Sequence, residues 1–144
     1  MTNLFEETYQ QIQKAKNLKK NASTEEEKQI AKDQYTKAEE AIESLGQDAC
    51  TIYRQYAVSR NSGNELLNIY DVLYDNQVPI LVELMKEHGI KEFTFSSTWS
   101  RAIEIAWLFQ ENGCKLEGLI EINAQYVNYS TDEFEKIPAY LFRV

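Results

Sequence analysis

Three hydroxyl side chains in a row, Ser96, Ser97 and Thr98, follow a strand-like segment and precede an apolar helical segment. A serine at such a strand-to-helix turn can act as a nucleophile when small neighbours leave its hydroxyl clear and a base lies within reach. Here the preceding residue is Phe95, no glycine follows within ten residues, and the only histidine of the chain is His88. We therefore interpret the hydroxyls as helix N-cap residues. A small enzyme that uses this corner, with His88 or a carboxylate as base, is the less favoured alternative.

Two further arrangements of polar residues could form sites. The helix start after the hydroxyls offers free N–H groups to an anion, but the segment lacks a glycine-rich loop and the lysine of a P-loop. Glu117, Glu121 and Asn123 lie on one face of a predicted strand, and two carboxylates without a third ligand are more often a solvated face than a metal site or an acid–base pair. We predict no catalytic residue, no metal site, no cofactor and no enzymatic activity.

Tyrosines and carboxylates gather around the last predicted hairpin of the chain. Tyrosine beside acidic residues is a composition typical of protein interfaces. The candidate partner-binding residues are Glu117, Glu121, Tyr126, Tyr129, Asp132, Glu133 and Glu135.

The charge distribution indicates the kind of partner. The 144 residues carry a formal net charge of −8, and residues 61–144 hold 13 acidic and 6 basic residues. Such a surface repels phosphate, which disfavours direct nucleic-acid binding through this half and favours a basic protein partner. No apolar run is long enough to span a membrane, the polar start is unlike a signal peptide, and Cys50 and Cys114 are expected to be reduced. We therefore expect a cytoplasmic protein.

The elements before residue 61 are predicted to be helical. Apolar residues at helical spacing predict an amphipathic helix over 3–20, and Ser23 with Glu26 or Thr24 with Glu27 fits a capping box for the next helix. Gly46 leaves open whether residues 24–58 form one helix or two. We predict a helical hairpin domain over 1–60, which offers a route to a homodimer.

Residues 61–144 are predicted to form a small α-β-α-β-β domain, so the fold class is α+β with a three-stranded mixed sheet. The β-α-β crossover implies parallel pairing and a right-handed connection if its two strands share a sheet, and the last two strands are expected to form an antiparallel hairpin with its loop at 127–135. The predicted elements are a short helix in 65–74, a helix from Asp75–Asn76 to Gly89, a strand at 90–95, a helix at 98–111, a strand at 116–123 and a strand at 137–143 that starts near Pro138.

The helix at 98–111 is apolar on nearly every side, with Trp99 and Trp107 at core spacing. A helix of that kind is expected to pack on two sides, between the sheet and other helices. We therefore predict that Trp107 is nearly fully buried.

From about Tyr56 to Val144 the chain resembles a family of small proteins borne on plasmids and conjugative elements of Gram-positive bacteria. The segments that carry the resemblance are SGNELL (62–67), HGIKEFTFSST (88–98), NGCKLEGLIEIN (112–123), Tyr126 and IPA (137–139). The resemblance implies no catalytic residue, and the hairpin loop VNYSTDEFEK is more acidic here than the loop usual in the family.

Small acidic proteins of mobile elements often resemble inhibitors of host defence, including anti-CRISPR proteins. The resemblance and the charge together favour a non-enzymatic protein that occludes a basic, nucleic-acid-handling partner, with a Cas9-type effector as the most specific hypothesis. The alternative from another class is a structural or regulatory accessory of a conjugative element that dimerises through its N-terminal helices.

Overall fold

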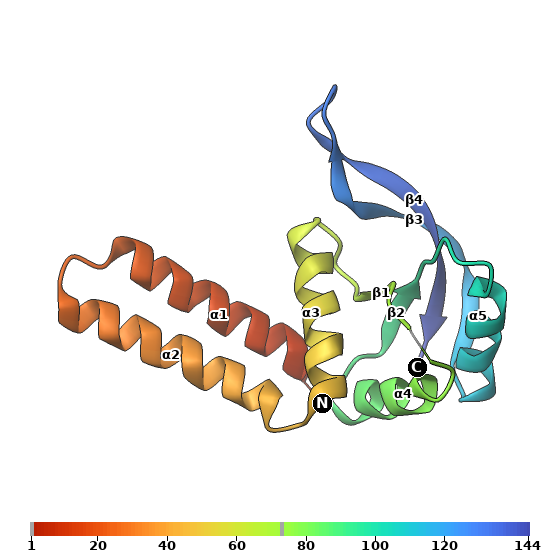
Figure 1. Cartoon of the computed structure of the whole chain (residues 1–144), viewed down its shortest axis with the longest axis horizontal. Helices are drawn as coiled ribbons and strands as arrows, with labels where there is room; N and C mark the ends of the chain where they lie inside the picture. Colours follow the sequence, from red (N-terminus) through yellow and green to blue (C-terminus); the bar gives the residue numbers. More distant parts are fainter. Residues whose placement is uncertain (1, 73) are drawn as a thin grey trace.

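The computed structural model describes residues 2–72 and 74–144, which form five helices and a four-stranded mixed sheet (Figure 1). This confirms the α+β class, with helices first and a strand-rich C-terminal part. The elements are α1 (Leu4–Asn21), α2 (Glu25–Glu43), α3 (Gln47–Asn61), β1 (Asn68–Ile69), α4 (Gln77–Glu87), β2 (Glu92–Phe95), α5 (Ala102–Glu111), β3 (Lys115–Asn128) and β4 (Glu133–Arg143).

Helices α1 and α2 form a hairpin that projects from the rest of the molecule (Figure 1). Of the two possible capping pairs, the structure uses Thr24 and Glu27: the Thr24 hydroxyl accepts from Glu27 N at 3.1 Å, and the Glu27 carboxylate accepts from Ser23 N at 3.0 Å. The helical conformation is interrupted at Gly46, where φ is +101°, so residues 24–58 contain two helices. The predicted domain boundary at residue 60 falls at the end of α3, and the independence of residues 1–60 and 61–144 stays a prediction.

The start of α1 is anchored on the turn that ends α4. Leu4 N donates to the carbonyl of His88 at 3.0 Å, and the Phe5 side chain is fully buried. Gly89 has φ +87°, and a Cβ at this position would lie 2.2 Å from the Thr2 carbonyl oxygen. Glycine is therefore required here both by the backbone conformation and by the close approach of the N-terminal segment.

The strand order of the sheet is β1-β2-β4-β3. β1 is parallel to β2, and β4 pairs antiparallel with both β2 and β3, so β2 and β3 run parallel with β4 between them. The predicted hairpin and the parallel direction of β2 and β3 are confirmed. The predicted pairing of these two strands is wrong, because β4 lies between them, and the sheet has four strands rather than three. Pro138 was predicted near the start of this strand, but it lies in the middle of β4 and pairs with Glu121 of β3. Because β2 pairs only with Tyr140–Arg143, β4 has no second neighbour in the sheet at Pro138.

The additional strand, β1, replaces the short helix predicted in residues 65–74. Leu67 and Ile69 are buried at 1% and 0% exposure, while the Asn68 side chain bonds to Thr94 and Ser96. This alternation has the period of two that defines a strand. A two-residue strand is too short for its period to be recognised from the sequence.

Side chains of α3 close the outer edge of β1. The Gln55 side chain is fully buried, and its Oε1 accepts from Tyr70 N at 2.8 Å and from Asp71 N at 3.2 Å. The buried Ser59 hydroxyl accepts from Asn68 N at 2.9 Å. These bonds satisfy N–H groups that an edge strand would otherwise present to another chain.

Helix α5 covers the sheet with a cluster of aromatic rings. Phe109 lies with its ring centroid 5.0 Å from Phe93, 5.6 Å from Phe95 and 5.5 Å from Phe142. All four phenylalanines are at most 2% exposed. Helix α4 adds Val78, Leu81, Val82 and Met85 to the same core.

The prediction for the helix at 98–111 is wrong in two respects. The helix begins at Ala102, with Arg101 as an N-cap that makes no side-chain cap bond, and the Ser97 hydroxyl instead accepts from Trp99 N in the preceding turn. Its packing is one-sided: Trp107 is 56% exposed, Trp99 57% and Ile103 74%. Of the other helices, α4 contacts α5, whereas the α1–α2 hairpin extends away from α5 (Figure 1).

Candidate functional site

The exposed apolar side chains of α5 face the side of β3. At about 100° per residue, Ile103 and Trp107 lie more than about 100° around the helix from Arg101. Arg101 faces α4, because its guanidinium bonds to Asp75, just before α4, at 2.9 Å. Ile103 and Trp107 therefore lie on the flank of α5 that faces away from α4, above the outer strand of the sheet.

Strand β3 contributes two apolar residues to the same side. Leu116 pairs with Phe142 and Leu119 with Tyr140. Directly paired residues share a face, and the rings of Phe142 and Tyr140 lie on the face that α5 covers. Leu116 and Leu119 nevertheless remain 38% and 67% exposed. We call Ile103, Trp107, Leu116 and Leu119 the α5–β3 patch.

Carboxylates border this patch. Glu104 and Glu111 are exposed on α5, and Glu121 is exposed on β3, two residues after Leu119 on the same face. Arg101 bonds to Glu104 at 2.6 Å and to Asp75 at 2.9 Å, so its charge is already offset. Glu111 and Glu121 have no ion-pair partner among the residues that the structure describes. The border is therefore net negative around an apolar centre.

The predicted partner-binding residues fall into two groups on the β3–β4 hairpin. Tyr129 is fully exposed and Asp132 has φ +59°; both lie in the four-residue tip, where Asn128 accepts from Ser130 N and Asp132 N at 2.8 Å each. Glu133 follows at the start of β4, and Tyr126 and Glu135 lie nearby along the two strands. We call residues 124–135 the β-arm; it extends beyond the sheet in Figure 1.

Glu117 and Glu121 form the second group, at the base of the hairpin. Tyr129 lies eight positions after Glu121 along the hairpin, which corresponds to about 27 Å of extended chain. The Glu117 carboxylate bonds to Arg143 at 3.1 Å, next to a bulge between Leu116 and Gly118. The structure thus brings the tip residues together and separates them from these two glutamates.

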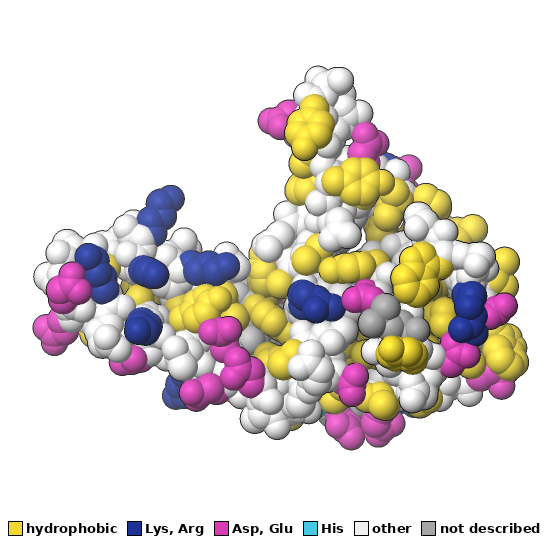
Figure 2. All heavy atoms as spheres, viewed as in Figure 1, with side chains coloured by type: hydrophobic (Ala, Val, Ile, Leu, Met, Phe, Trp, Pro, Cys, Tyr) yellow, Lys and Arg dark blue, Asp and Glu magenta, His cyan; other side chains and the backbone are white. Residues whose placement is uncertain are grey.

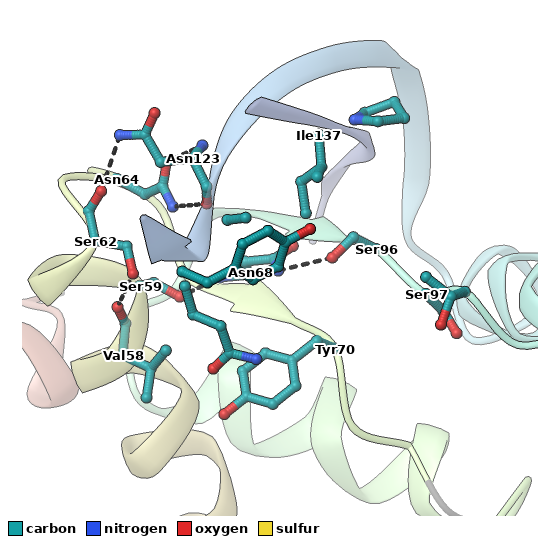
Figure 3. Close-up of a pocket in the computed structure, with 15 residues that line it drawn as sticks. Val58, Ser59, Ser62, Asn64, Asn68, Tyr70, Ser96, Ser97, Asn123 and Ile137 are labelled. Carbon is teal, nitrogen blue, oxygen red and sulfur yellow. Dashed lines mark hydrogen bonds between the residues drawn. The ribbon is translucent and has the colours of Figure 1, made fainter. Parts of the chain in front are cut away.

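The hydroxyl corner lines a cavity of about 280 Å³ between the end of α3 and the base of the β-arm (Figure 3). Ser96 accepts from the Asn68 carboxamide at 2.9 Å. His88 lies at the other end of β2, where its ring meets Phe5 edge-on at 6.1 Å. The serines and His88, one of the two kinds of base considered for the enzymatic alternative, are therefore at opposite ends of a strand.

The two cysteines are unpaired in the structure. Cys50 is half-buried, Cys114 is buried, and both are free. Burial raises the pKa of the Cys114 thiol to about 11, although the ammonium of Lys86 acts in the opposite direction.

Within residues 2–72 and 74–144, no three His, Cys, Asp or Glu side chains are grouped to hold a metal ion. In the same ranges, no helix has the length and apolar character needed to cross a membrane.

A hydrogen-bonded carboxylate joins α1 to α3. Tyr56 donates to Glu6 at 2.5 Å, and Arg60 pairs with the same carboxylate at 3.2 Å. Burial raises the pKa of Glu6, but the bonds from Tyr56 and Gln10 and the charge of Arg60 outweigh it, so the pKa of Glu6 is lowered. This cluster attaches the helical hairpin to α3.

In the view of Figure 2, basic and acidic side chains both lie on the α1–α2 hairpin, whereas apolar side chains are prominent over the rest of that face. Sequence reasoning missed the α5–β3 patch, although its signal was visible. The apolar residues on several sides of α5 were attributed to partners within the chain, when one side of the helix has none among the described residues.

Comparisons with curated proteins and with solved structures gave no match. Residues 51–144 match a family described as a domain of unknown function, DUF7698. The match begins inside α3 and includes the whole sheet, α4 and α5, so α1 and α2 lie outside it. The chain belongs to the DUF7698 family.

Proposed function

We propose that this protein is a non-enzymatic binding module that docks on a basic partner protein through the α5–β3 patch. The observation that carries the proposal is the outward position of Trp107 and Ile103, 56% and 74% exposed on a helix whose other side is packed in the core. Contiguous exposed apolar residues with a polar border are characteristic of protein interaction sites.

The residue types support a partner-binding role. Tryptophan is among the residues that contribute most to binding energy when an interface buries it. Glu104, Glu111 and Glu121 border the patch and would attract cationic side chains around an apolar contact. Complementary charge of this kind mainly increases the association rate and the specificity. The partner surface should therefore combine an apolar centre with lysine or arginine at its edge.

The β-arm supplies a second contact in this proposal. Tyr129, Asp132 and Glu133 lie at its tip, and Tyr129 is fully exposed. An acidic arm can enter a basic channel that normally holds nucleic acid, and so compete with the phosphate backbone. Together with the resemblance to small proteins of mobile elements, this makes a Cas9-type effector the first specific target to test. Inhibition would then result from occlusion.

The docking surface can be tested by site-specific photocrosslinking in cells. A photoreactive residue at position 107 should give a discrete adduct with a basic protein, and Ile103→Glu should abolish it. The matched control is position 99, since Trp99 is also 57% exposed but lines a different hollow with Tyr70 and Val72. Adducts of equal yield at both positions, or an adduct with an acidic protein, would contradict the proposal.

The specific target needs its own experiment. Cleavage of DNA by a Cas9-type effector is measured with the full chain, with Trp107→Ala and with a variant that removes Asp132 and Glu133. We expect inhibition that weakens as salt increases and is reduced in both variants. If the full chain does not bind at low salt, the effector is not the target, whereas the photocrosslinking result would stand.

An accessory role through self-association is the second candidate, favoured by the exposure of Leu18 at 46% and Ile30 at 50% on the α1–α2 hairpin. Light scattering of the full chain should then give a dimer that Ile30→Glu dissociates. A monomer at all concentrations would remove this candidate.

A further inference from the structure

We infer that the cavity at the hydroxyl corner binds a compact, uncharged ring that presents hydrogen-bond acceptors and one flat face, such as a nucleoside or a monosaccharide. Its volume of about 280 Å³ lies just below the usual range for small-molecule pockets, about 300–1,000 Å³. The site is separate from the α5–β3 patch and does not depend on the proposed function. All residues that line it fall between Val58 and Pro138, inside the region that matches the family.

The lining carries no charge, and its surface is mainly apolar with a few polar groups. The polar groups are hydroxyls, carboxamides and the phenols of Tyr70 and Tyr126, and Val58, Ala124, Ile137 and Pro138 add aliphatic surface. A phosphate or carboxylate would lose its hydration there without gaining a cation. Lys136, whose ammonium donates to the Asn123 side-chain oxygen, is not part of the lining. The ligand is therefore neutral.

The floor of the cavity is rigidly held. Asn68 is 8% exposed; its Nδ2 donates to Ser96 Oγ at 2.9 Å, and its Oδ1 accepts from Thr94 Oγ1 at 2.8 Å. Figure 3 shows Asn68 and Ser96 joined at the centre of the cavity, with Tyr70 below them. A network with fixed partners does not have to reorganise when a ligand enters.

The hydrogen bonds within the protein determine which groups remain for a ligand. Ser59 and Ser62 donate to the carbonyls of Gln55 at 2.7 Å and Val58 at 2.8 Å, so their protons are used. Ser96 and Ser97 differ, because in their bonds with Asn68 and with Trp99 N they are the acceptors. A hydroxyl that accepts still has its own proton to donate. The corner therefore offers two donors to the cavity, and the ligand must present acceptors.

The mouth of the cavity has a fixed width and an aromatic wall. Asn64 and Asn123 bond to each other twice: Asn64 Nδ2 donates to the Asn123 carbonyl at 2.8 Å, and Asn123 N donates to Asn64 Oδ1 at 2.9 Å. Asn123 Nδ2 also donates to the Ser62 carbonyl at 2.8 Å. These bonds fasten the base of the β-arm to the end of α3. Tyr70 and Tyr126 line the cavity, and Tyr126 is 58% exposed. An open tyrosine ring provides a surface on which a flat ligand can stack.

The test is a titration of the ¹⁵N-labelled full chain with adenosine, uridine, glucose and N-acetylglucosamine at millimolar concentration, followed by NMR. We expect one of these classes to shift the amide signals of Ser96, Ser97 and Tyr126, and the nucleoside and sugar arms identify the source. Adenosine 5′-monophosphate should bind more weakly than adenosine, because the cavity has no cation for its phosphate.

Two pairs of variants make the test specific. Ser96→Ala removes one donor and should weaken binding about tenfold, the equivalent of one hydrogen bond. Ser100→Ala, exposed and outside the lining, should leave it unchanged. Tyr126→Ala should likewise weaken binding, and Tyr129→Ala should not. The inference is wrong if none of the four probes shifts the corner signals, or if the monophosphate binds more tightly than adenosine.

Discussion

Replacing Trp107 by alanine should destabilise the protein only modestly, in contrast to Phe109 two residues later on the same helix. Trp107 is 56% exposed and Phe109 is 0% exposed. A tryptophan side chain accounts for about 150–250 Å² when buried. With less than half of that covered, Trp107 removes about 100 Å² from water, or at most about 2.5 kcal/mol. The unfolded chain already covers part of this area, and alanine keeps part of it covered in the folded state. The expected loss in the free energy of unfolding is therefore about 1–2 kcal/mol.

Phe109→Ala should instead cost about 3–5 kcal/mol, because it loses its full transfer energy and leaves a cavity among Phe93, Phe95 and Phe142. Urea unfolding followed by far-ultraviolet circular dichroism measures both variants, and equal m values show that the two transitions are comparable. Exposed Glu111→Ala serves as the control, within about 0.5 kcal/mol of the parent. If Trp107→Ala costs as much as Phe109→Ala, the side chain is in the core and the α5–β3 patch does not exist.

Four further predictions follow from buried or strained positions. Gln55→Ala should lower the free energy of unfolding by about 2–4 kcal/mol because two N–H groups lose their acceptor, whereas exposed Gln11→Ala should change it by less than about 0.5 kcal/mol; equal urea midpoints would refute this. Gly89→Ala should cost more than about 1–2 kcal/mol from its left-handed backbone and the contact with the N-terminal segment, and an unchanged melting temperature would contradict it. Burial raises the pKa of Tyr53 to about 12, so the stability that depends on its neutral phenol is complete below about pH 10 and is lost as the pH rises towards 12; urea midpoints that stay constant across this window would exclude the effect. Because burial raises the pKa of Cys114 to about 11, this thiol should react with a disulfide reagent at neutral pH only after unfolding, and rapid labelling of the folded chain would show that it is accessible.

Local signals predicted the elements that have their own start and stop residues. Thr24 with Glu27 defines the start of α2, Gly89 ends the helix before β2, and the alternation in Glu92–Phe95 is that of a strand. β1 has no comparable signal. Its two residues are extended because Phe95 and Thr94 lie beside them and because Gln55 accepts the N–H groups that follow, and these contacts depend on tertiary structure.

The candidate site was predictable only in part. The exposed tyrosine and carboxylates of the β-arm follow from a polar hairpin loop, and Tyr129 lies at the tip as that composition suggests. The patch on α5 does not follow in the same way. Apolar residues around a helix indicate that several sides avoid water, but they do not say whether the covering surface belongs to the same chain. Ile103 and Trp107 are therefore identified by the fold and not by their spacing.

The bonds from Gln55 and Ser59 to the backbone around β1 have a consequence for polymerisation. A sheet with two open edges can accept a strand at each end and grow without limit, as in fibres. Here the N–H groups on the outer side of β1 are bonded to side chains of α3. Among the described strands, the long unpaired edges are that of β3 and that of residues 133–139 of β4, which β2 does not reach. A strand added at either edge would leave the β1 end closed, so the protein would act as a chain terminator at that end of a growing sheet.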